Sequence, residues 1–129
     1  MNELIMTINV TTCQAQMLEN EKSRVVMIPF KAEAKGKYFN GKTVSDGVDT
    51  QITAADGFSL SARYMLEGTD ICGKKCRVFI ENNGSSLDNC TPKIYTDSEK
   101  LAFLEKAKLT AAAECTENGV IVRVYADDT

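Results

Sequence analysis

The sequence predicts an all-β protein: a single-domain, antiparallel, up-and-down β-barrel with one short helical segment near the C-terminus. Three observations support this fold class. Apolar and polar residues alternate over most of the chain, turn residues separate the alternating runs at regular intervals, and only one window has helical spacing. Because no linker, repeat or low-complexity segment interrupts the pattern, we expect one domain over residues 1–129.

Two long alternating runs occupy the first part of the chain. Residues 3–12 and 24–35 place aliphatic side chains at every second position, as expected of half-buried strands. Pro29 lies inside the second run and has no N–H to donate to a strand ladder, so we expect an edge, a bulge or a corner there. Asn40-Gly41 is typical of a two-residue hairpin turn and predicts a reversal before a short strand over 42–45.

The hairpin within residues 39–67 turns at Ala55-Asp56-Gly57. A three-residue loop commonly combines a type I turn with a glycine in the left-handed region. This loop pairs Ala54 with Phe58, and it places Asp49 directly opposite Arg63. One face of the hairpin then carries Val48, Thr50, Ile52, Leu60, Ala62 and Tyr64. The other face carries Asp49, Gln51, Ser61 and Arg63.

A strand, a turn and a helical segment are predicted next. Residues 76–82 alternate, and Asn82-Asn83-Gly84 predicts the turn that ends them. Residues 92–95 predict a short strand. Asp97 or Ser98 resembles a helix N-cap, and the leucines that follow have helical spacing, so a short helix is expected within 98–106.

A terminal hairpin over residues 109–115 and 120–125 closes the chain around Glu117-Asn118-Gly119. About eight to ten short strands joined by successive hairpins favour an up-and-down barrel, lipocalin-like in shape. A barrel of about eight strands encloses an interior that side chains just fill, or that holds one small ligand. The sequence leaves both alternatives open.

The composition excludes several classes of function. A net charge of −3 and a pI near 5.0 argue against binding to nucleic acid. We expect no membrane association, because no run approaches the roughly 18 apolar residues of a spanning helix. The first residues lack a basic signal region, so a cytoplasmic location is expected. The chain has no histidine, which excludes serine–histidine and cysteine–histidine catalysis, and we predict neither a metal nor a cofactor.

Five cysteines, an odd number in a chain without an export signal, predict reduced thiols. The spacing of Cys72 and Cys76 differs from the two-residue spacing of common redox and zinc motifs. A zinc site built from Cys13, Cys72, Cys76 and Cys90 is therefore disfavoured.

The polar face of the central hairpin is the candidate site. If that face meets solvent, Asp49 and Arg63 form a surface ion pair that contributes about 0.2–1 kcal/mol. If it lines the barrel lumen, the desolvated carboxylate and guanidinium can anchor a polar ligand. The candidate ligand-binding residues are Asp49, Gln51, Ser61, Arg63 and Asn82.

Several short motifs occur in a familiar order along the chain. They are GVDTQ (47–51), DG (56–57), ARYMLE (62–67), IENNG (80–84), TPKI (91–94) and LAFLEKA (101–107). Together they resemble the bacterial uncharacterised protein family 0311 (domain of unknown function 3237) over residues 30–114. The resemblance implies a small antiparallel β-barrel with a short helical segment near the C-terminus. It implies no activity, because the family has no agreed one.

Two family patterns map onto the central hairpin. The glycine–any–aspartate pattern matches Gly47 and Asp49, and the alanine–arginine–tyrosine pattern begins at Ala62. The sequence departs from the family at Thr50, where an aromatic residue is expected, and at Leu101, where tyrosine is expected. These changes would alter which ligand fits. Since the motifs fall on both faces of the hairpin, we expect Tyr64 to be a packing residue and Asp49 and Arg63 to be site residues.

Three functions agree with this sequence. The first is a small-molecule-binding protein with Asp49 and Arg63 as its polar anchor. The second is a filled barrel that acts as an interaction protein, for instance as a homodimer. The third is a cofactor-free isomerase, cyclase or lyase. In that enzyme Asp49 or Glu81 would be the general base, and Arg63 or Tyr64 would stabilise an oxyanion.

Overall fold

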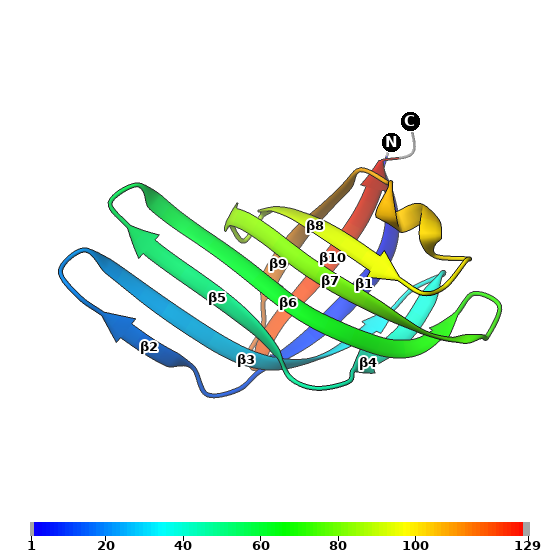
Figure 1. Ribbon diagram of the computed structural model, residues 1–129, viewed down its shortest axis with the longest axis horizontal. Helices are drawn as coiled ribbons and strands as arrows, with labels where there is room; N and C mark the ends of the chain where they lie inside the picture. Colours follow the sequence, from blue (N-terminus) through cyan, green and yellow to red (C-terminus); the bar gives the residue numbers. More distant parts are fainter. Residues whose placement is uncertain (1, 128–129) are drawn as a thin grey trace.

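Ten strands form one antiparallel sheet, which closes into a barrel (Figure 1). The computed structural model describes residues 2–127. The strands are β1 (Asn2–Thr12), β2 (Gln16–Glu19), β3 (Ser23–Lys35), β4 (Phe39–Thr43), β5 (Gly47–Ala54), β6 (Gly57–Asp70), β7 (Lys75–Ser86), β8 (Asn89–Thr96), β9 (Leu109–Cys115) and β10 (Gly119–Asp127). One short 3-10 helix, η1 (Ala102–Glu105), lies between β8 and β9.

The strands follow one another around the barrel in chain order. From β3 onward each strand pairs with the next, except that β4 and β5 both lie between β3 and β6. Strand β1 closes the ring, because it pairs with β10 on one side and with β3 on the other. The ring therefore has eight positions, and the predicted up-and-down barrel is confirmed. Strand β2 pairs with β3 outside the ring.

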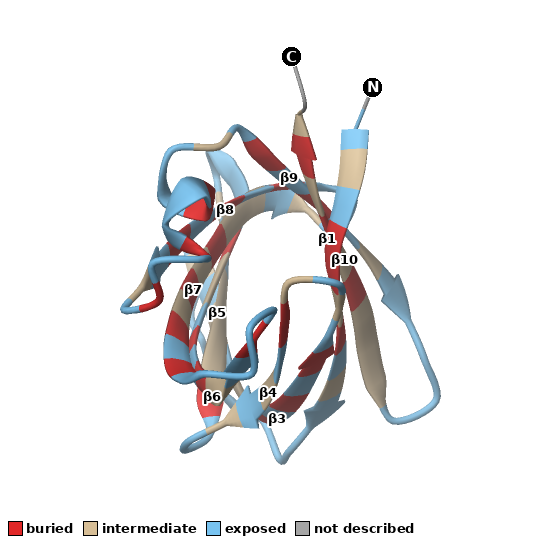
Figure 2. Ribbon diagram, turned by 90° about the vertical axis from the view of Figure 1, so that its right-hand side faces the viewer, coloured by how far each residue is buried: buried red, intermediate tan, exposed pale blue. Residues whose placement is uncertain are grey.

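Strands β8 and β9 form the weakest seam of the barrel. They share a single residue pair, Cys90 with Ala111, and then separate. The helix η1 packs beside β8 near this gap, and Figure 2 shows it on the outside of the ring of strands. The predicted helical segment is thus present, but it is only one 3-10 turn.

The core lies inside the ring and follows the alternation of the strands. Along β6 and β7 the even-numbered residues from Leu60 onward point inward, and the large apolar ones among them are buried, whereas Phe58, next to the hairpin turn, is exposed. Phe30 of β3 packs edge-on against Tyr64 of β6, with 5.1 Å between ring centroids. The packing role expected for Tyr64 is therefore confirmed.

The predicted register of the central hairpin is wrong by one residue. Gly57 has the expected positive φ, 126°, but Ala54 pairs with Gly57 instead of Phe58. Every later pair shifts accordingly, so that Asp49 lies opposite Ala62. The reason is packing around Gly47. In the observed register Gly47 lies against Phe30 and Tyr64, where a Cβ atom would come within 2.6 Å of both Phe30 Cζ and Tyr64 Cβ, so the missing side chain of Gly47 makes room for the two rings in the core.

Two predicted turns are also wrong. Asn40-Gly41 lies within β4, and the chain reverses before it, over 36–38. The side chain of Asn40 stabilises that reversal, because it accepts from the Gly36 N–H and donates to the Gly36 carbonyl. Likewise, Asn82-Asn83-Gly84 lies within β7, which pairs with β8 as far as Ser86.

The strand pairing is irregular at two places. The ladder between β1 and β10 shifts between Leu4 and Met6, so both Ile5 and Met6 are buried while Leu4 is 47% exposed. At Pro29, where an edge, a bulge or a corner is expected, β3 changes partner on one side, because it pairs with β2 before this residue and with β1 after it.

Candidate functional site

A cavity of about 250 Å³ lies inside the barrel. Its wall comes from β1, β3, β5, β6, β7, β9 and β10, so the cavity belongs to the lumen and not to the outer surface. Most of the wall is apolar, with aliphatic side chains from β1, β3 and β10 and the rings of Phe30 and Tyr64. The polar side chains that converge on it include Asp49, Gln51 and Asn82.

Asp49, Ala62 and Asn82 form one rung across three adjacent strands. Asp49 of β5 is paired with Ala62 of β6, and Ala62 is paired with Asn82 of β7. All three line the cavity. Because the middle residue of the rung is alanine, no long side chain stands between the carboxylate on one side and the amide on the other.

The carboxylate of Asp49 is only half satisfied. Gln51 Nε2 donates to Asp49 Oδ2 at 2.9 Å, whereas Asp49 Oδ1 is buried and has no hydrogen-bond partner among the described residues. Burial raises the pKa of this carboxyl group above its usual value, although the hydrogen bond from Gln51 acts in the opposite direction.

Asn82 presents a second unpaired oxygen. The residue is 7% exposed, and its Oδ1 has no hydrogen-bond partner within residues 2–127. Its side chain also interacts with the buried thiol of Cys90, whose pKa is raised by burial and by the charge of Asp49. Two residues of the cavity wall, on either side of Ala62, therefore each carry a buried oxygen acceptor without a donor among the described residues.

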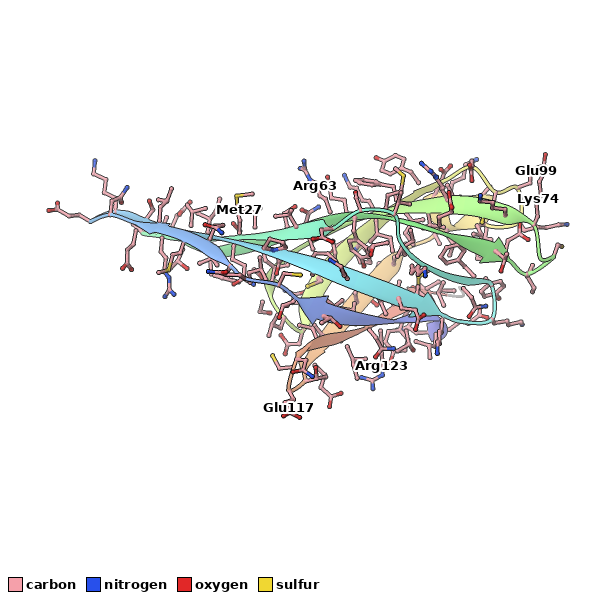
Figure 3. The ribbon with its side chains drawn as sticks, turned by 90° about the horizontal axis from the view of Figure 1, so that it is seen from below. Met27, Arg63, Lys74, Glu99, Glu117 and Arg123 are labelled. Carbon is pink, nitrogen blue, oxygen red and sulfur yellow. The ribbon has the colours of Figure 1, made fainter. Side chains whose placement is uncertain are left out.

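Two of the sequence-predicted site residues lie outside the lumen. Arg63 is on the outer face of β6, where its side chain is 66% exposed and its Nε lies 3.1 Å from Glu81 Oε2. Figure 3 shows Arg63 projecting away from the barrel. Ser61 shares that outer face and lies between Thr50 and Asn83. The predicted Asp49–Arg63 pair is therefore wrong, because the one-residue shift of register turns the two side chains to opposite faces.

The structure thus brings Asp49, Gln51 and Asn82 together and separates them from Ser61 and Arg63. It adds Tyr64 and Ala62, which the sequence had grouped with the apolar face. Knowledge that Ala54 pairs with Gly57 would have allowed this grouping to be predicted, because that pairing determines which residues of β5 share a face with Tyr64.

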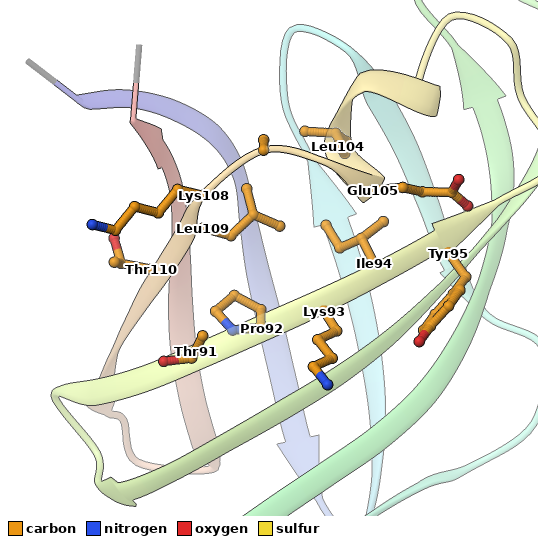
Figure 4. Close-up of a pocket in the computed structure, with 11 residues that line it drawn as sticks. Thr91, Pro92, Lys93, Ile94, Tyr95, Leu104, Glu105, Lys108, Leu109 and Thr110 are labelled. Atoms are coloured by element: carbon orange, nitrogen blue, oxygen red, sulfur yellow. The ribbon is translucent and has the colours of Figure 1, made fainter. Parts of the chain in front are cut away.

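A second hollow, of about 490 Å³, lies on the outside where β8 and β9 separate. Figure 4 shows Ile94, Leu104 and Leu109 converging in it, while Lys93 and Lys108 extend away. The carboxylate of Glu105 at its margin accepts a hydrogen bond from the backbone N–H of Thr96, 3.0 Å away. We find no unpaired buried side-chain oxygen among the described residues here, so this hollow offers less chemistry than the lumen.

Two further observations on residues 2–127 concern metal-ligand clusters and membrane-spanning helices. No three histidine, cysteine, aspartate or glutamate side chains in this part of the chain are grouped closely enough to hold a metal ion. Over the same residues, the structure contains no helix with the length and apolar character needed to cross a membrane.

Comparisons with known proteins identify the fold. No protein-family model matches this chain, and no curated protein matches it either. A protein of unknown function from Clostridium acetobutylicum is 25% identical and has a TM-score of 0.81 over 97% of each chain. A conserved protein of unknown function from Rhodopseudomonas palustris is 17% identical, with a TM-score of 0.76 over 98% of this chain and 96% of its own. A β-barrel-like protein from Acinetobacter baumannii is 18% identical, with a TM-score of 0.74 over 97% and 95%.

Proposed function

We propose that this protein binds a small, mostly apolar molecule in its barrel lumen, with Asp49, Gln51 and Asn82 at the polar end of the site. The observation that carries this proposal is that two buried oxygens without a protein donor among the described residues, Asp49 Oδ1 and Asn82 Oδ1, belong to the wall of one cavity, whereas the third unpaired oxygen, Ser61 Oγ, lies on the outer face. Small-molecule sites are typically apolar cavities with a few convergent polar groups.

The energetic cost of these oxygens supports a ligand. A buried polar group without a partner costs about 1–3 kcal/mol, and folded proteins contain few of them. A filled barrel would have apolar side chains at these positions, whereas this lumen keeps a cavity of about 250 Å³ beside them. That space suits one small ring with a substituent, since an apolar cavity of about 150 Å³ can hold benzene.

The resemblance to the uncharacterised barrel family supports the same proposal. We propose that the chain is a member, because the family pattern of glycine–any–aspartate falls on Gly47, which seats the Phe30–Tyr64 pair, and on Asp49, in the cavity wall. We also propose a cytoplasmic location, since an odd number of cysteines without an export signal is typical of reduced thiols.

A cofactor-free isomerase, cyclase or lyase is the second candidate. It is favoured by one observation, the burial that raises the pKa of Asp49 inside the cavity, because a general base works best when its pKa is near the working pH. Arg63 and Glu81 cannot take part in this reaction in the lumen, since they pair with each other on the outer face. Tyr64 remains as the candidate donor to an oxyanion.

Native mass spectrometry of freshly purified protein, before and after denaturation, tests the binding proposal. We expect a co-purified small molecule that is lost on denaturation and that is depleted in Asp49→Asn and Asn82→Ala. Asp56→Asn is the matched control, because it removes the same charge from the exposed turn of the same hairpin. The same spectra report whether the protein is a homodimer. Equal retention in Asp49→Asn and Asp56→Asn would place the ligand elsewhere.

A further inference from the structure

We infer that the ligand of the lumen is a small apolar amine, whose protonated –NH₃⁺ group lies above Ala62 and donates to both Asp49 Oδ1 and Asn82 Oδ1. This inference rests on the proposed binding function and names the chemical class of the ligand. Three features of the described cavity lead to it: the kind of polar atom left unpaired, the balance of charge, and the spacing of the rung.

The unpaired atoms are acceptors. Both are oxygens, one from a carboxylate and one from an amide. The nearby Gln51 Nε2 donates to Asp49 Oδ2 and makes no hydrogen bond to Asp49 Oδ1 or Asn82 Oδ1. A ligand that offers only acceptors, such as an ether, a ketone or a carboxylate, would leave both oxygens unpaired. The ligand must therefore bring hydrogen-bond donors to this end of the cavity.

The charge balance selects a cation. Asp49 is the only acidic residue in the described wall of the cavity, and no lysine or arginine from residues 2–127 lines it. The remaining phenol and thiol side chains nearby belong to Tyr64, Cys90 and Cys115, and none of them supplies a positive charge. Arg63, the closest predicted counter-ion, is held outside by Glu81. A desolvated carboxylate without a counter-ion favours a cationic ligand.

The spacing of the rung requires more than one donor from the same group. Asp49 and Asn82 are separated by one intervening strand, so their Cα atoms lie about 10 Å apart. When these two short side chains turn toward each other over Ala62, one nitrogen atom between them can lie within about 2.8 Å of both oxygens. A hydroxyl group has a single hydrogen and satisfies one oxygen, whereas an ammonium group has three and satisfies both.

A matched set of ring probes tests this inference. Benzylamine, benzyl alcohol, toluene and benzoate share a ring that fits the cavity and differ only in the substituent. Dissociation constants from NMR titration at neutral pH should rank benzylamine tightest, benzyl alcohol and toluene weaker, and benzoate weakest. The advantage of benzylamine over toluene should disappear in acid, as Asp49 becomes protonated.

Two variants locate the contact. Asp49→Asn should weaken benzylamine binding by about ten- to a hundredfold, as expected for a lost charge-assisted hydrogen bond, and should leave toluene binding unchanged. Ala62→Val enlarges the middle side chain of the rung and should weaken benzylamine more than toluene. Asp56→Asn is the control that should alter neither. Retained toluene binding shows that each variant is folded.

The outcomes separate the two proposals. If the probes bind but benzylamine is no tighter than toluene, or is unaffected by Asp49→Asn, the amine inference is wrong and the lumen remains a binding site. If none of the four probes binds, and native mass spectrometry shows no co-purified molecule, both the amine inference and the proposed function are wrong.

Discussion

Replacing Gly47 with alanine should destabilise the barrel by forcing apart its central pair of rings. A Cβ atom at this position would lie 2.6 Å from Phe30 Cζ, 2.6 Å from Tyr64 Cβ and 2.9 Å from Phe30 Cε1. Ordinary carbon–carbon contacts are about 3.5–4.0 Å, so each of these atoms must move by roughly 0.6 Å or more. Tyr64 Cβ is fixed to the backbone of β6, and the strand itself must therefore shift.

Overpacking of this kind costs about 1–3 kcal/mol. We expect the upper part of that range, about 2–3 kcal/mol, because one of the clashing atoms cannot rotate away. For a domain of this size, that loss lowers the melting temperature by roughly 6–15 °C. The rings also line the lumen, so the affinity of toluene should change at the same time.

Urea unfolding followed by circular dichroism measures the loss in Gly47→Ala. The double variant Gly47→Ala/Phe30→Leu removes the ring atoms that the new methyl group meets, so its total loss should be smaller than the sum of the two single losses by at least about 0.5 kcal/mol. Ser45→Ala, in the exposed loop before β5, is the control and should stay within about 0.5 kcal/mol of the parent. A cost below 0.5 kcal/mol for Gly47→Ala would refute the register of the hairpin.

Three further predictions concern charged side chains. The pKa of Asp49 is raised by burial, so the stability of the protein should fall as pH rises through the folded-state pKa of this group. Asp49→Asn should therefore have a higher melting temperature than the parent at neutral pH and an equal one near pH 3.8. A difference in melting temperature that does not change with pH would contradict this. The pKa of Asp70 is lowered, chiefly by the Ser98 hydroxyl 2.8 Å away, so the contribution of Asp70 to stability should be lost as pH falls through its folded-state pKa. At neutral pH, Asp70→Asn should lower the melting temperature, and Ser98→Ala should lower it by a smaller amount. Arg63→Ala removes a surface ion pair, so the free energy of unfolding should change by no more than about 1 kcal/mol. Binding of the ring probes should not change. Loss of probe binding would show that Arg63 is a site residue.

The strands could be predicted because a half-buried strand leaves a period of two in the sequence. That signal is averaged over many residues, and it survives one bulge, as at Ile5 and Met6. The register depends on a single loop, and a change of one residue there moved Arg63 to the other face. The sequence around Gly57 suits both loop lengths. The packing of Phe30 and Tyr64 over Gly47, a contact across three neighbouring strands that are far apart in sequence, favours one of them.

The candidate site was predicted in part for the same reason. Asp49 and Gln51 share a face under either register, since they are two residues apart in the same strand, β5. Asn82 lies beside them because β6 pairs with β7. This neighbourhood could not be predicted, because Asn82-Asn83-Gly84 is typical of a turn that ends the strand. The unpaired state of the two oxygens depends on all the neighbouring strands at once, and no local pattern encodes it.

The position of β1 has a consequence for how the chain reaches its native state. Thr12 N–H donates to the carbonyl of Asn118, 106 residues later, and the ladder between β1 and β10 extends from there. During synthesis on the ribosome, β1 can pair with β3 early but must wait for almost the whole chain before β10 arrives. Such non-local pairing slows folding, and an unpaired strand edge promotes aggregation in the meantime. The nascent chain is therefore most vulnerable along the free edge of β1, until β10 covers it.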